Sequence, residues 1–234
     1  PGGVTTKINE PGPVLSEDQQ EALIGLLLDQ ARGASWVVLA GSLPPGVPAD
    51  FYATVTRRLR SLRNDDAAPR IAVDSSGDPL AAAISGDASG KPDLLKPNAE
   101  ELAELAAAAG FATDKSAEEL EADPAAAAAA AAAIVRSGVG AVLATLGSKG
   151  AVLVTSDGAW LATHPPVKAV STVGAGDSSL AGYLLAASQG AAPADCLRQA
   201  VAHGAAAASL PGSTVPAVNQ TTPEAVTITA LRKD

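Results

Sequence analysis

The chain has 234 residues, of which 47% are hydrophobic and 3% aromatic, and its formal net charge is −9 at pH 7. This length allows one α/β domain with a large core, which must be built mainly from Ala, Val, Leu and Ile because aromatic residues are scarce. No basic stripe is visible, which argues against a protein that binds nucleic acid by neutralising its phosphates.

Short apolar runs alternate along the chain with helical segments. We expect strands at residues 35–40, 70–74, 93–96, 141–146 and 151–155, the last forming a hairpin with 158–163. We expect helices at residues 16–32, 49–63, 98–109, 124–137, 175–189 and 193–209. Apolar runs without alternation suit strands buried on both faces, and strands separated by helices form βαβ units. The sequence therefore predicts a parallel sheet covered by helices.

Two of the expected helices begin with recognisable capping residues. Ser16 is followed three positions later by Gln19, which is the spacing of a capping box. Asp123 precedes Pro124, the order of an N-cap and a first helical residue. The alanine run at residues 125–133 then needs no functional interpretation, because Ala is the best intrinsic helix former.

The single cysteine, Cys196, cannot form an internal disulfide, and we interpret it as a small core residue of a helix. No stretch has the pattern of a membrane span or of a signal peptide. These features predict a cytoplasmic protein. The chain starts at Pro1 and contains no methionine, so we interpret it as a fragment of a longer protein.

Residues 171–183 carry the sharpest chemical pattern in the chain. A strand-like approach leads into Gly174-Ala175-Gly176, and Asp177 follows at once at the start of a helix. Glycines and the free amides of a helix N-terminus form a pocket that attracts phosphate or a developing oxyanion. Asp177 either takes a proton from an attacking hydroxyl beside that pocket or only caps the helix, and the pattern alone leaves both open.

Five motifs follow one another in the order found in a known enzyme family. They are residues 41–46 (GSLPPG), 73–77 (VDSSG), 96–101 (KPNAEE), 145–151 (TLGSKGA) and 172–177 (TVGAGD). On these motifs the chain resembles the PfkB, or ribokinase-like, carbohydrate kinases. The resemblance implies a three-layer α/β/α fold with a mainly parallel central sheet, in which residues 1–234 form a single kinase domain. It also implies that the first strands and most of a small β-sheet lid lie outside this chain.

The resemblance assigns a set of residues to the phosphate donor. Asp177 would be the catalytic base, and Gly174, Ala175 and Gly176 would form the anion hole. ATP would contact Lys96, Thr145, Gly147, Lys149, Gly150 and, near the adenine, His203. The alternatives are an ordinary surface lysine at position 96 and a packed helical histidine at position 203.

Mg²⁺ would be held by Asn98 and Glu101, with Asp74 assisting from a strand end. Positions 98 and 101 are three apart and share a helix face, and magnesium keeps several waters and needs few protein carboxylates. The alternative for this pair is an N-cap asparagine followed by a first-turn glutamate.

Residues 5–13 resemble a segment of the 1-phosphofructokinase branch, which implies ATP-dependent phosphorylation of fructose 1-phosphate to fructose 1,6-bisphosphate. Lys7, Asn9 and Ser42 are the candidates for acceptor binding; a strand with a solvated lysine and a rigid Pro-Pro turn are the alternatives. The competing functions are a 6-phosphofructokinase, a tagatose-6-phosphate kinase and a non-catalytic protein that binds nucleotide or sugar phosphate. The family also implies a homodimeric parent protein with small-molecule partners rather than nucleic acid or membrane. We expect weak acceptor binding, or none, from the truncated chain alone.

Overall fold

One seven-stranded sheet forms the centre of the fold, and its strands lie side by side in chain order. The computed structural model describes residues 11–64, 68–108, 110–111 and 114–231. The strands are β1 (Trp36–Ala40), β2 (Arg70–Asp74), β3 (Leu94–Leu95), β4 (Ala141–Thr145), β5 (Ala151–Thr155), β6 (Ala159–Thr163) and β7 (Thr227–Leu231). The helices are α1 (Glu17–Gln30), α2 (Phe51–Arg60), α3 (Gly77–Ile84), α4 (Ala99–Ala108), α5 (Ala117–Ala122), α6 (Pro124–Arg136), α7 (Ala175–Ser188) and α8 (Pro193–Ala208).

The sheet has a parallel part and an antiparallel part. Strands β1 to β4 pair in parallel, with Val37 opposite Ile71 and Leu95 opposite Val142. Each of β5, β6 and β7 pairs antiparallel with the strand before it. Because β6 again runs in the direction of β1 to β4, most strands share one direction, as the sequence predicts.

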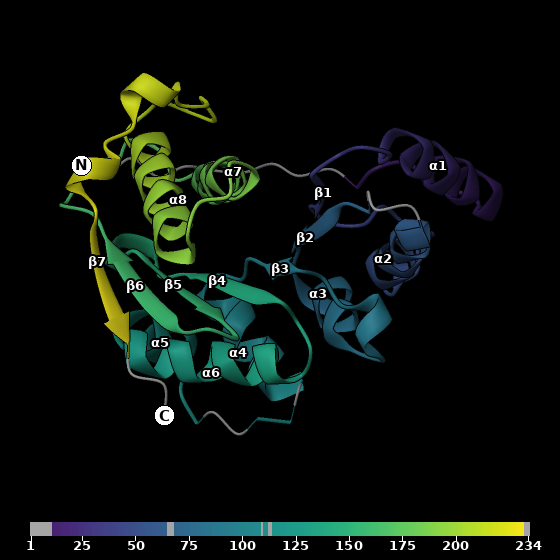
Figure 1. Cartoon of the computed structure of the whole chain (residues 1–234), viewed down its shortest axis with the longest axis horizontal. Coiled ribbons are helices and arrows are strands. Elements are labelled where there is room, and N and C mark those ends of the chain that lie inside the picture. The colour runs from purple at the N-terminus through teal and green to yellow at the C-terminus, as the bar shows by residue number, and fades with distance from the viewer. Residues whose placement is uncertain (1–10, 65–67, 109, 112–113, 232–234) are drawn as a thin grey trace.

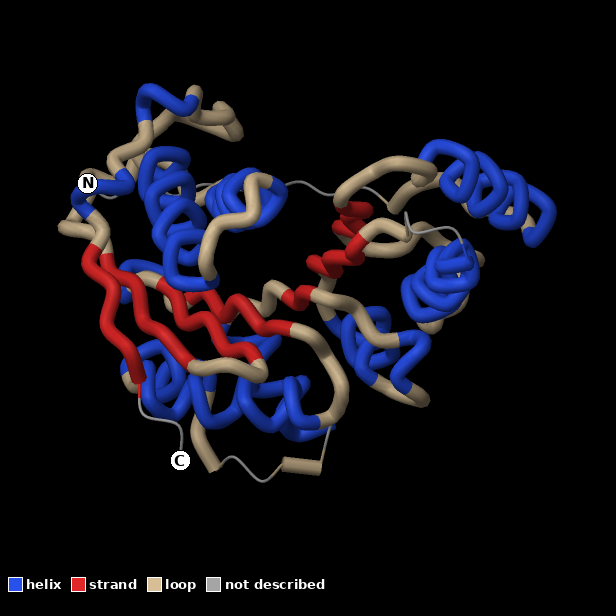
Figure 2. The backbone as a smooth tube through the Cα atoms, in the orientation of Figure 1, coloured by secondary structure: helices blue, strands red, loops and turns tan. Residues whose placement is uncertain are grey.

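Helices cover both faces of the sheet. Helices α1 to α6 pack on one face around a core that includes Leu59, Leu102 and Ile134. Helices α7 and α8 pack on the other face around Leu180 and Leu197. Figures 1 and 2 show α4 to α6 below the strands β4 to β7, with α7 and α8 above them. The predicted three-layer α/β/α architecture is confirmed.

The two predicted helix starts are confirmed by their hydrogen bonds. The Gln19 amide donates to Ser16 Oγ at 3.3 Å, and the Ser16 amide donates to Gln19 Oε1 at 2.9 Å. A serine cap of this kind contributes about 1 kcal/mol to stability. The Ala126 amide donates to Asp123 Oδ1 at 3.1 Å, and Pro124 is the first residue of α6.

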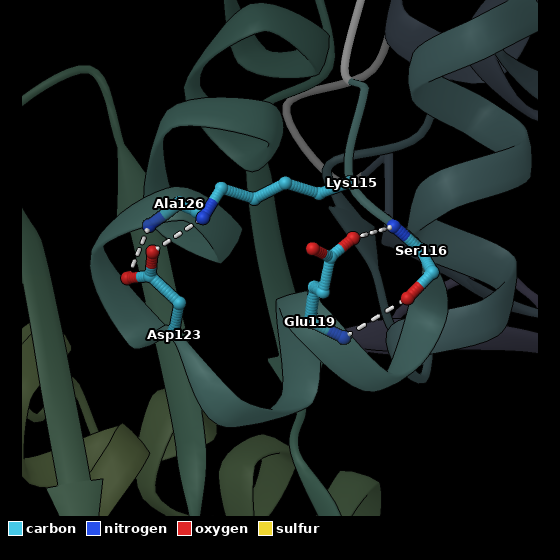
Figure 3. A network of polar contacts seen from close by, with 5 residues as sticks. All are labelled: Lys115, Ser116, Glu119, Asp123 and Ala126. Atoms are coloured by element: carbon cyan, nitrogen blue, oxygen red, sulfur yellow. Dashed lines mark hydrogen bonds and ion pairs between the residues drawn. The ribbon is translucent and has the colours of Figure 1, made fainter.

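Helix α5 was not predicted, and polar contacts fix its two ends (Figure 3). The Glu119 amide donates to Ser116 Oγ at 3.2 Å, and the Ser116 amide donates to Glu119 Oε2 at 2.7 Å. At the other end Lys115 Nζ donates to Asp123 Oδ2 at 2.7 Å. A helix this short shows too little periodicity to be recognised from apolar residues, so the capping box was its only sequence signal.

Helix α3 and strand β7 were also not predicted. Helix α3 starts at Gly77, whose φ is +59°, and continues through Asp78-Pro79, a composition typical of turns. Strand β7 is a short threonine-containing run that pairs with β6, with Leu161 opposite Thr229. Contacts distant in sequence decide both elements. The predicted elements lie within three residues of their expected bounds.

Candidate functional site

The carboxyl ends of the parallel strands bring predicted site residues to one edge of the sheet. Strand β2 ends at Asp74, β3 is followed by Lys96, and β4 ends at Thr145. Asn98 lies beside Thr145 and forms an isolated parallel bridge with it. The carboxyl edge of an open α/β sheet is where such folds bind ligands.

Helix α7 starts with a left-handed glycine as its N-cap. Gly174 has φ +78°, and its carbonyl accepts the first helical bond, from the Ser178 amide at 2.9 Å. The amides of Gly176 and Asp177 lie in the first turn, where backbone donors have no acceptor within the helix. With the positive end of the helix dipole they favour an anion at this point. The Asp177 side chain is exposed beside them.

A buried ion pair lies close to the start of α7. Lys96 Nζ is 3.1 Å from Asp74 Oδ1, and the two side chains are only 7% and 14% exposed. The same nitrogen is 3.1 Å from the position that a Cβ on Gly176 would occupy. Lys96 therefore extends from the end of β3 to α7, and the missing side chain at position 176 keeps this approach open.

Burial and two charged neighbours shift the pKa of the Asp74 carboxyl. Burial is the largest influence and raises its pKa above the ordinary 3.8. The charge of Lys96 and its hydrogen bond oppose that rise, and the negative charge of Asp177 adds a smaller rise of its own. The pKa of Asp74 is raised overall, and the influence of Asp177 shows that the two carboxyl groups are near enough to interact electrostatically.

Asn98 and Glu101 form a reciprocal cap at the start of α4. The Asn98 amide donates to Glu101 Oε2 at 2.8 Å, and the Glu101 amide donates to Asn98 Oδ1 at 2.9 Å. The capping alternative considered for this pair is therefore present in the structure. Burial, the largest influence, raises the pKa of Glu101, while the bond from the Asn98 amide and the charge of Lys96 lower it and Asp74 raises it further.

The carboxylates of Glu101 and Asp74 fit a hydrated magnesium ion. In the part of the chain that the structure describes, no group of three or more His, Cys, Asp or Glu side chains could hold a metal by themselves. Magnesium usually keeps several waters and takes one or two carboxylates, which is a smaller demand. Glu101 uses one oxygen in the cap, and Asp74 lies near enough to influence its pKa. This donor set suits magnesium better than a metal that needs a full protein cage.

A cavity of about 540 Å³ opens next to the start of α7. Its walls come from the turn after β4, the segment after β6, the first turn of α7 and the middle of α8. The predicted residues among them are Thr145, Gly147, Lys149, Gly150, Ala175 and Gly176. Six of the predicted donor-site residues thus share one cavity of a size typical for small-molecule ligands.

Glycines shape the turn between β4 and β5. Gly150 has φ +97°, and a Cβ there would overlap the carbonyl oxygen of Ala162 on β6. Gly147 has φ +50°, and a Cβ there would lie 2.5 Å from Glu121 Oε1 of α5. Both positions favour glycine for the backbone conformation, and Gly150 also requires it for space, because the Ala162 carbonyl oxygen belongs to the backbone. The turn therefore lies tightly between α5 and β6 while it faces the cavity.

A family model described as pfkB family carbohydrate kinase matches residues 2–220. The chain belongs to the pfkB family. This membership agrees with the resemblance drawn from the five motifs.

Relatives of this pfkB chain are named for two related activities. The 1-phosphofructokinase of Rhodobacter capsulatus is 36% identical over 200 residues, which cover 84% of this chain and 56% of that protein. The 1-phosphofructokinase of Bacillus subtilis is 32% identical over 206 residues, 88% of this chain and 61% of that protein. The ATP-dependent 6-phosphofructokinase isozyme 2 of Mycobacterium tuberculosis is 35% identical over 203 residues, 87% of this chain and 54% of that protein. The chain spans little more than half the length of these relatives.

Solved structures share the architecture. The crystal structure of Escherichia coli phosphofructokinase-2 in complex with potassium has a TM-score of 0.74 and 33% identity, and the match covers 91% of this chain and 62% of that one. A putative phosphofructokinase from Staphylococcus aureus has a TM-score of 0.76 and 26% identity over 99% of this chain and 69% of that one. A ribokinase from Thermotoga maritima, with a TM-score of 0.60 and 21% identity over 82% of this chain and 57% of that one, shares the fold alone.

His203 lies between α7 and α8 and is not part of the cavity wall. The side chain is buried, and its Nδ1 is 2.8 Å from the Gln199 carbonyl oxygen. A Cβ on Gly182 would lie 2.7 Å from the same ring nitrogen. His203 is therefore packed within the helices, which is the alternative that the sequence left open.

The structure describes one of the three predicted acceptor residues. Lys7 and Asn9 lie outside the described residues. Ser42 is exposed in the turn that follows β1. The single cysteine, Cys196, is buried as expected, and burial raises the pKa of its thiol.

Sequence reasoning missed His164, Ser179 and Gly204, which also line the cavity. His164 Nε2 is 2.8 Å from Thr222 Oγ1, so it ties the segment after α8 to the cavity rim. The proximity of His164 to Pro165-Pro166 was its only signal, because its partner lies 58 residues away. No helix in the described ranges has the length and apolar character needed to cross a membrane.

Proposed function

We propose that the protein containing this chain transfers the terminal phosphoryl group of ATP to fructose 1-phosphate, giving fructose 1,6-bisphosphate and ADP. The observation that carries the proposal is the position of Asp177 beside Gly176 in the first turn of α7, with the buried pair of Lys96 and Asp74 close by. An anion pocket next to an acidic side chain supplies the positioning and the proton acceptor that phosphoryl transfer requires.

The cavity is the proposed nucleotide site. Its volume of about 540 Å³ suits a nucleotide, and Ala175 and Gly176 form the end nearest the α7 amides. The phosphates would lie at that end, where the helix dipole and Lys96 favour negative charge. The nucleoside would extend between the turn at Gly147–Lys149 and α8, whose Val201 and Gly204 offer an apolar wall.

The proposed reaction is a direct in-line transfer. The C6 hydroxyl of fructose 1-phosphate gives its proton to Asp177 as its oxygen bonds to the terminal phosphorus, and the bond from that phosphorus to the ADP oxygen breaks. The amides of Gly176 and Asp177 stabilise the charge on the transferring group, and Lys96 adds positive charge next to Gly176. Mg²⁺, held by Glu101 and Asn98 with Asp74 nearby, would supply further charge neutralisation when bound.

The turn at residues 41–46 is the proposed acceptor side. Ser42 is exposed on it, at the same carboxyl edge as Asp74. Gly12, which follows the segment containing Lys7 and Asn9, lies against this turn, since a Cβ on Gly12 would be 3.3 Å from Pro44 Cβ. This contact supports a joint role for the two segments in acceptor binding.

Fructose 6-phosphate is the second candidate acceptor. It is favoured by the 35% identity to the Mycobacterium tuberculosis 6-phosphofructokinase isozyme 2 and by the 33% identity to Escherichia coli phosphofructokinase-2. Fructose 1-phosphate is favoured by the 36% and 32% identities to two 1-phosphofructokinases and by the resemblance of residues 5–13.

The test is the rate of ADP release from MgATP by the full-length gene product with fructose 1-phosphate, fructose 6-phosphate or tagatose 6-phosphate. We expect the highest kcat/KM with fructose 1-phosphate. A higher kcat/KM with another acceptor would support the kinase activity but show that fructose 1-phosphate is not the preferred substrate. Binding of ATP without release of ADP in the presence of any of the three would favour the non-catalytic alternative.

We also propose a homodimer for the full-length protein. An Escherichia coli relative, 32% identical to this chain, is described as tetrameric in its inhibited form. Sedimentation velocity with and without MgATP would distinguish a dimer from a tetramer. A single tetrameric species in both conditions would contradict the proposed dimer.

A further inference from the structure

His164 is the first residue after β6, and both nitrogens of its ring have partners. Its Nδ1 lies 2.7 Å from the Pro165 carbonyl oxygen, and its Nε2 lies 2.8 Å from Thr222 Oγ1. A carbonyl oxygen only accepts, so Nδ1 carries the proton. Nε2 of the neutral ring is then an acceptor, and the Thr222 hydroxyl donates to it. Because imidazole nitrogens bond in the plane of the ring, the two bonds together restrict its rotation.

Thr222 belongs to a segment that is anchored on α8. Arg198 of this helix donates from Nη1 to the carbonyl oxygens of Val226, at 2.5 Å, and Pro223, at 3.5 Å. Val226 is 3% exposed and packs in the core formed with α7 and α8. The Ala225 amide donates to the Thr222 carbonyl oxygen at 3.0 Å. The position of Thr222 is therefore set by α8, and Thr222 is not one of the residues that line the cavity.

The His164 ring lies in the wall of the cavity of about 540 Å³. Pro165, Pro166 and Val167 continue this wall, and α8 contributes Val201 to the same cavity. Among the cavity-lining residues that the structure describes, His164 carries the single aromatic ring. Since both of its nitrogens are engaged, the ring offers a ligand an aromatic surface rather than a hydrogen bond. Such a surface suits the π system of a nucleotide base.

We propose that His164 stacks on the base of the bound nucleotide and that Thr222 is a positioning residue that holds the ring for this contact. The inference rests on the proposed function, which places a nucleotide in this cavity. It adds one base-binding residue and one residue outside the cavity wall. A ring that is fixed before binding loses little conformational entropy when the base arrives, so the stacking contact contributes more to affinity.

The test of the stacking contact compares two ligands of the full-length gene product by isothermal titration calorimetry. They are MgATP and magnesium tripolyphosphate, which has three phosphates and no base. His164→Ala removes the ring and is expected to weaken MgATP binding about tenfold, within the range for replacing an aromatic side chain that stacks on a base. His164→Phe keeps a ring without its two bonds and should weaken MgATP binding about threefold. Neither substitution should change the affinity for tripolyphosphate.

Thr222→Val tests the positioning role, because Val has the shape of Thr without the hydroxyl. It is expected to weaken MgATP binding about threefold, the factor for one modest net hydrogen bond, and to raise the KM for ATP equally with kcat unchanged. Thr222→Ser keeps the hydroxyl and should restore most of the affinity. The double variant His164→Phe/Thr222→Val should bind MgATP as His164→Phe does, because the bond between the two side chains is already absent.

Thr221→Val is the matched control. The Thr221 hydroxyl donates to the Val218 carbonyl oxygen at 2.8 Å, within its own turn. This variant loses a hydroxyl bond one residue away from Thr222 and is expected to bind MgATP as the wild type does. Equal weakening in Thr221→Val and Thr222→Val would overturn the proposal. So would a loss of tripolyphosphate affinity in His164→Ala that equals the loss of MgATP affinity.

Binding and turnover together separate this inference from the proposed function. If the gene product binds MgATP but phosphorylates no sugar phosphate, the proposed reaction fails, and the affinities of the variants still decide the inference. If the wild type transfers phosphate and every variant binds MgATP as the wild type does, the inference fails and the proposed function stands. Absence of MgATP binding by the wild type would overturn both.

Discussion

The nucleotide side and the acceptor side of the sheet edge are built in different ways. On the nucleotide side, β4 and β5 are buried along most of their length, and a cavity of about 540 Å³ lies between the turn that joins them, the segment after β6, α7 and α8. On the acceptor side, β1 is buried only at alternate positions, Val38 is 43% exposed, and Ser42 stands exposed at the turn. Packing around glycines therefore fixes the first site, whereas a few hydrogen bonds to one turn, from Tyr52, Ser75 and Gln20, fix the second.

The two sides meet at Lys96 and Asp74. The Gly41 amide donates to the Asp74 carbonyl, while the Asp74 carboxylate pairs with the lysine that reaches Gly176. Substitutions at the junction, Lys96 and Asp74, should weaken both nucleotide and acceptor binding. Substitutions in the cavity should weaken only nucleotide binding, and substitutions in the turn at residues 41–46 should weaken only acceptor binding. The following variants test this division.

The largest effect is expected at Asp177. Asp177→Ala removes the proposed base and should lower kcat by about 10²–10⁴-fold, the usual contribution of a positioned proton acceptor. The KM for ATP should change little, because the α7 amides remain. Steady-state kinetics with saturating MgATP gives both values.

Asp195→Ala is the control for Asp177. Asp195 also lies in the first turn of a helix, α8, but its side chain is 62% exposed and pairs with Arg198 at 3.7 Å, away from the cavity wall. Its kcat should equal that of the wild type. Near-normal turnover in Asp177→Ala would remove Asp177 as the base.

The second effect concerns the shape of the nucleotide turn. Gly150→Ala adds a Cβ that overlaps the Ala162 carbonyl at a φ of +97°. Steric overlap and left-handed strain together should lower the free energy of unfolding by about 2–4 kcal/mol and weaken ATP binding. Urea denaturation and calorimetric titration with MgATP measure the two changes.

Gly190→Ala separates strain from overlap. Gly190 also has a positive φ, of +76°, but a Cβ there meets nothing within 4 Å. The free energy of unfolding should fall by about 1–2 kcal/mol, the cost of the left-handed conformation alone. ATP affinity should not change. Equal losses of ATP affinity in Gly150→Ala and Gly190→Ala would refute the link between the turn and the cavity.

The third effect is a dependence of the free energy of unfolding on pH that comes from Asp74. The folded pKa of Asp74 is raised above 3.8, so between 3.8 and the folded pKa the native state binds the proton more than the unfolded state does. Its contribution is therefore favourable at low pH and is lost as pH rises through the folded pKa. Relative to wild type, Asp74→Asn should become more stable as pH increases from 3 to 7 in urea denaturation.

Asp87→Asn should show the opposite slope. The side-chain and backbone bonds from Ser89 lower the pKa of Asp87, so its contribution is present above pH 3.8 and is lost as pH falls. This variant should therefore become less stable relative to wild type as pH rises. The same slope in both variants would show that the pH effect does not come from the environment of Asp74.

The smallest effects come from two matched helix caps. Ser16→Ala in α1 and Ser116→Ala in α5 each remove one capping box and should lower the free energy of unfolding by about 1 kcal/mol. Only Ser116→Ala should also weaken ATP binding, because α5 carries Glu121 against the Gly147 turn. Equal ATP affinities in the two variants would contradict the claim that α5 supports the nucleotide side and α1 does not.

The sequence was informative where a local pattern determines local structure. Strand ends, the left-handed Gly174 and the caps at Ser16 and Asp123 follow from residues close together in the chain. The cavity residues at the β4–β5 turn were predicted from a motif, and the resemblance led to the correct family.

The sequence was less informative where residues far apart in the chain determine structure. His203 could not be placed without knowing that α7 packs on α8 at Gly182. His164 depends on Thr222, and the Tyr52 bond to Gly41 depends on how α2 packs after β1. The reciprocal cap of Asn98 and Glu101 was considered, but the pairing of Lys96 with Asp74 was not, because it joins two separate strands.

Photolabelling with 8-azido-ATP, followed by peptide mapping, tests the central claim that the cavity between β4, β5, α7 and α8 holds the nucleotide. We predict labelled peptides that contain residues 145–151, 164–167 or 201–208, with protection by unlabelled MgATP. Protected labelling confined to the turn at residues 41–46, or to the smaller pocket lined by Gly77, Leu80 and Leu105, would contradict the account.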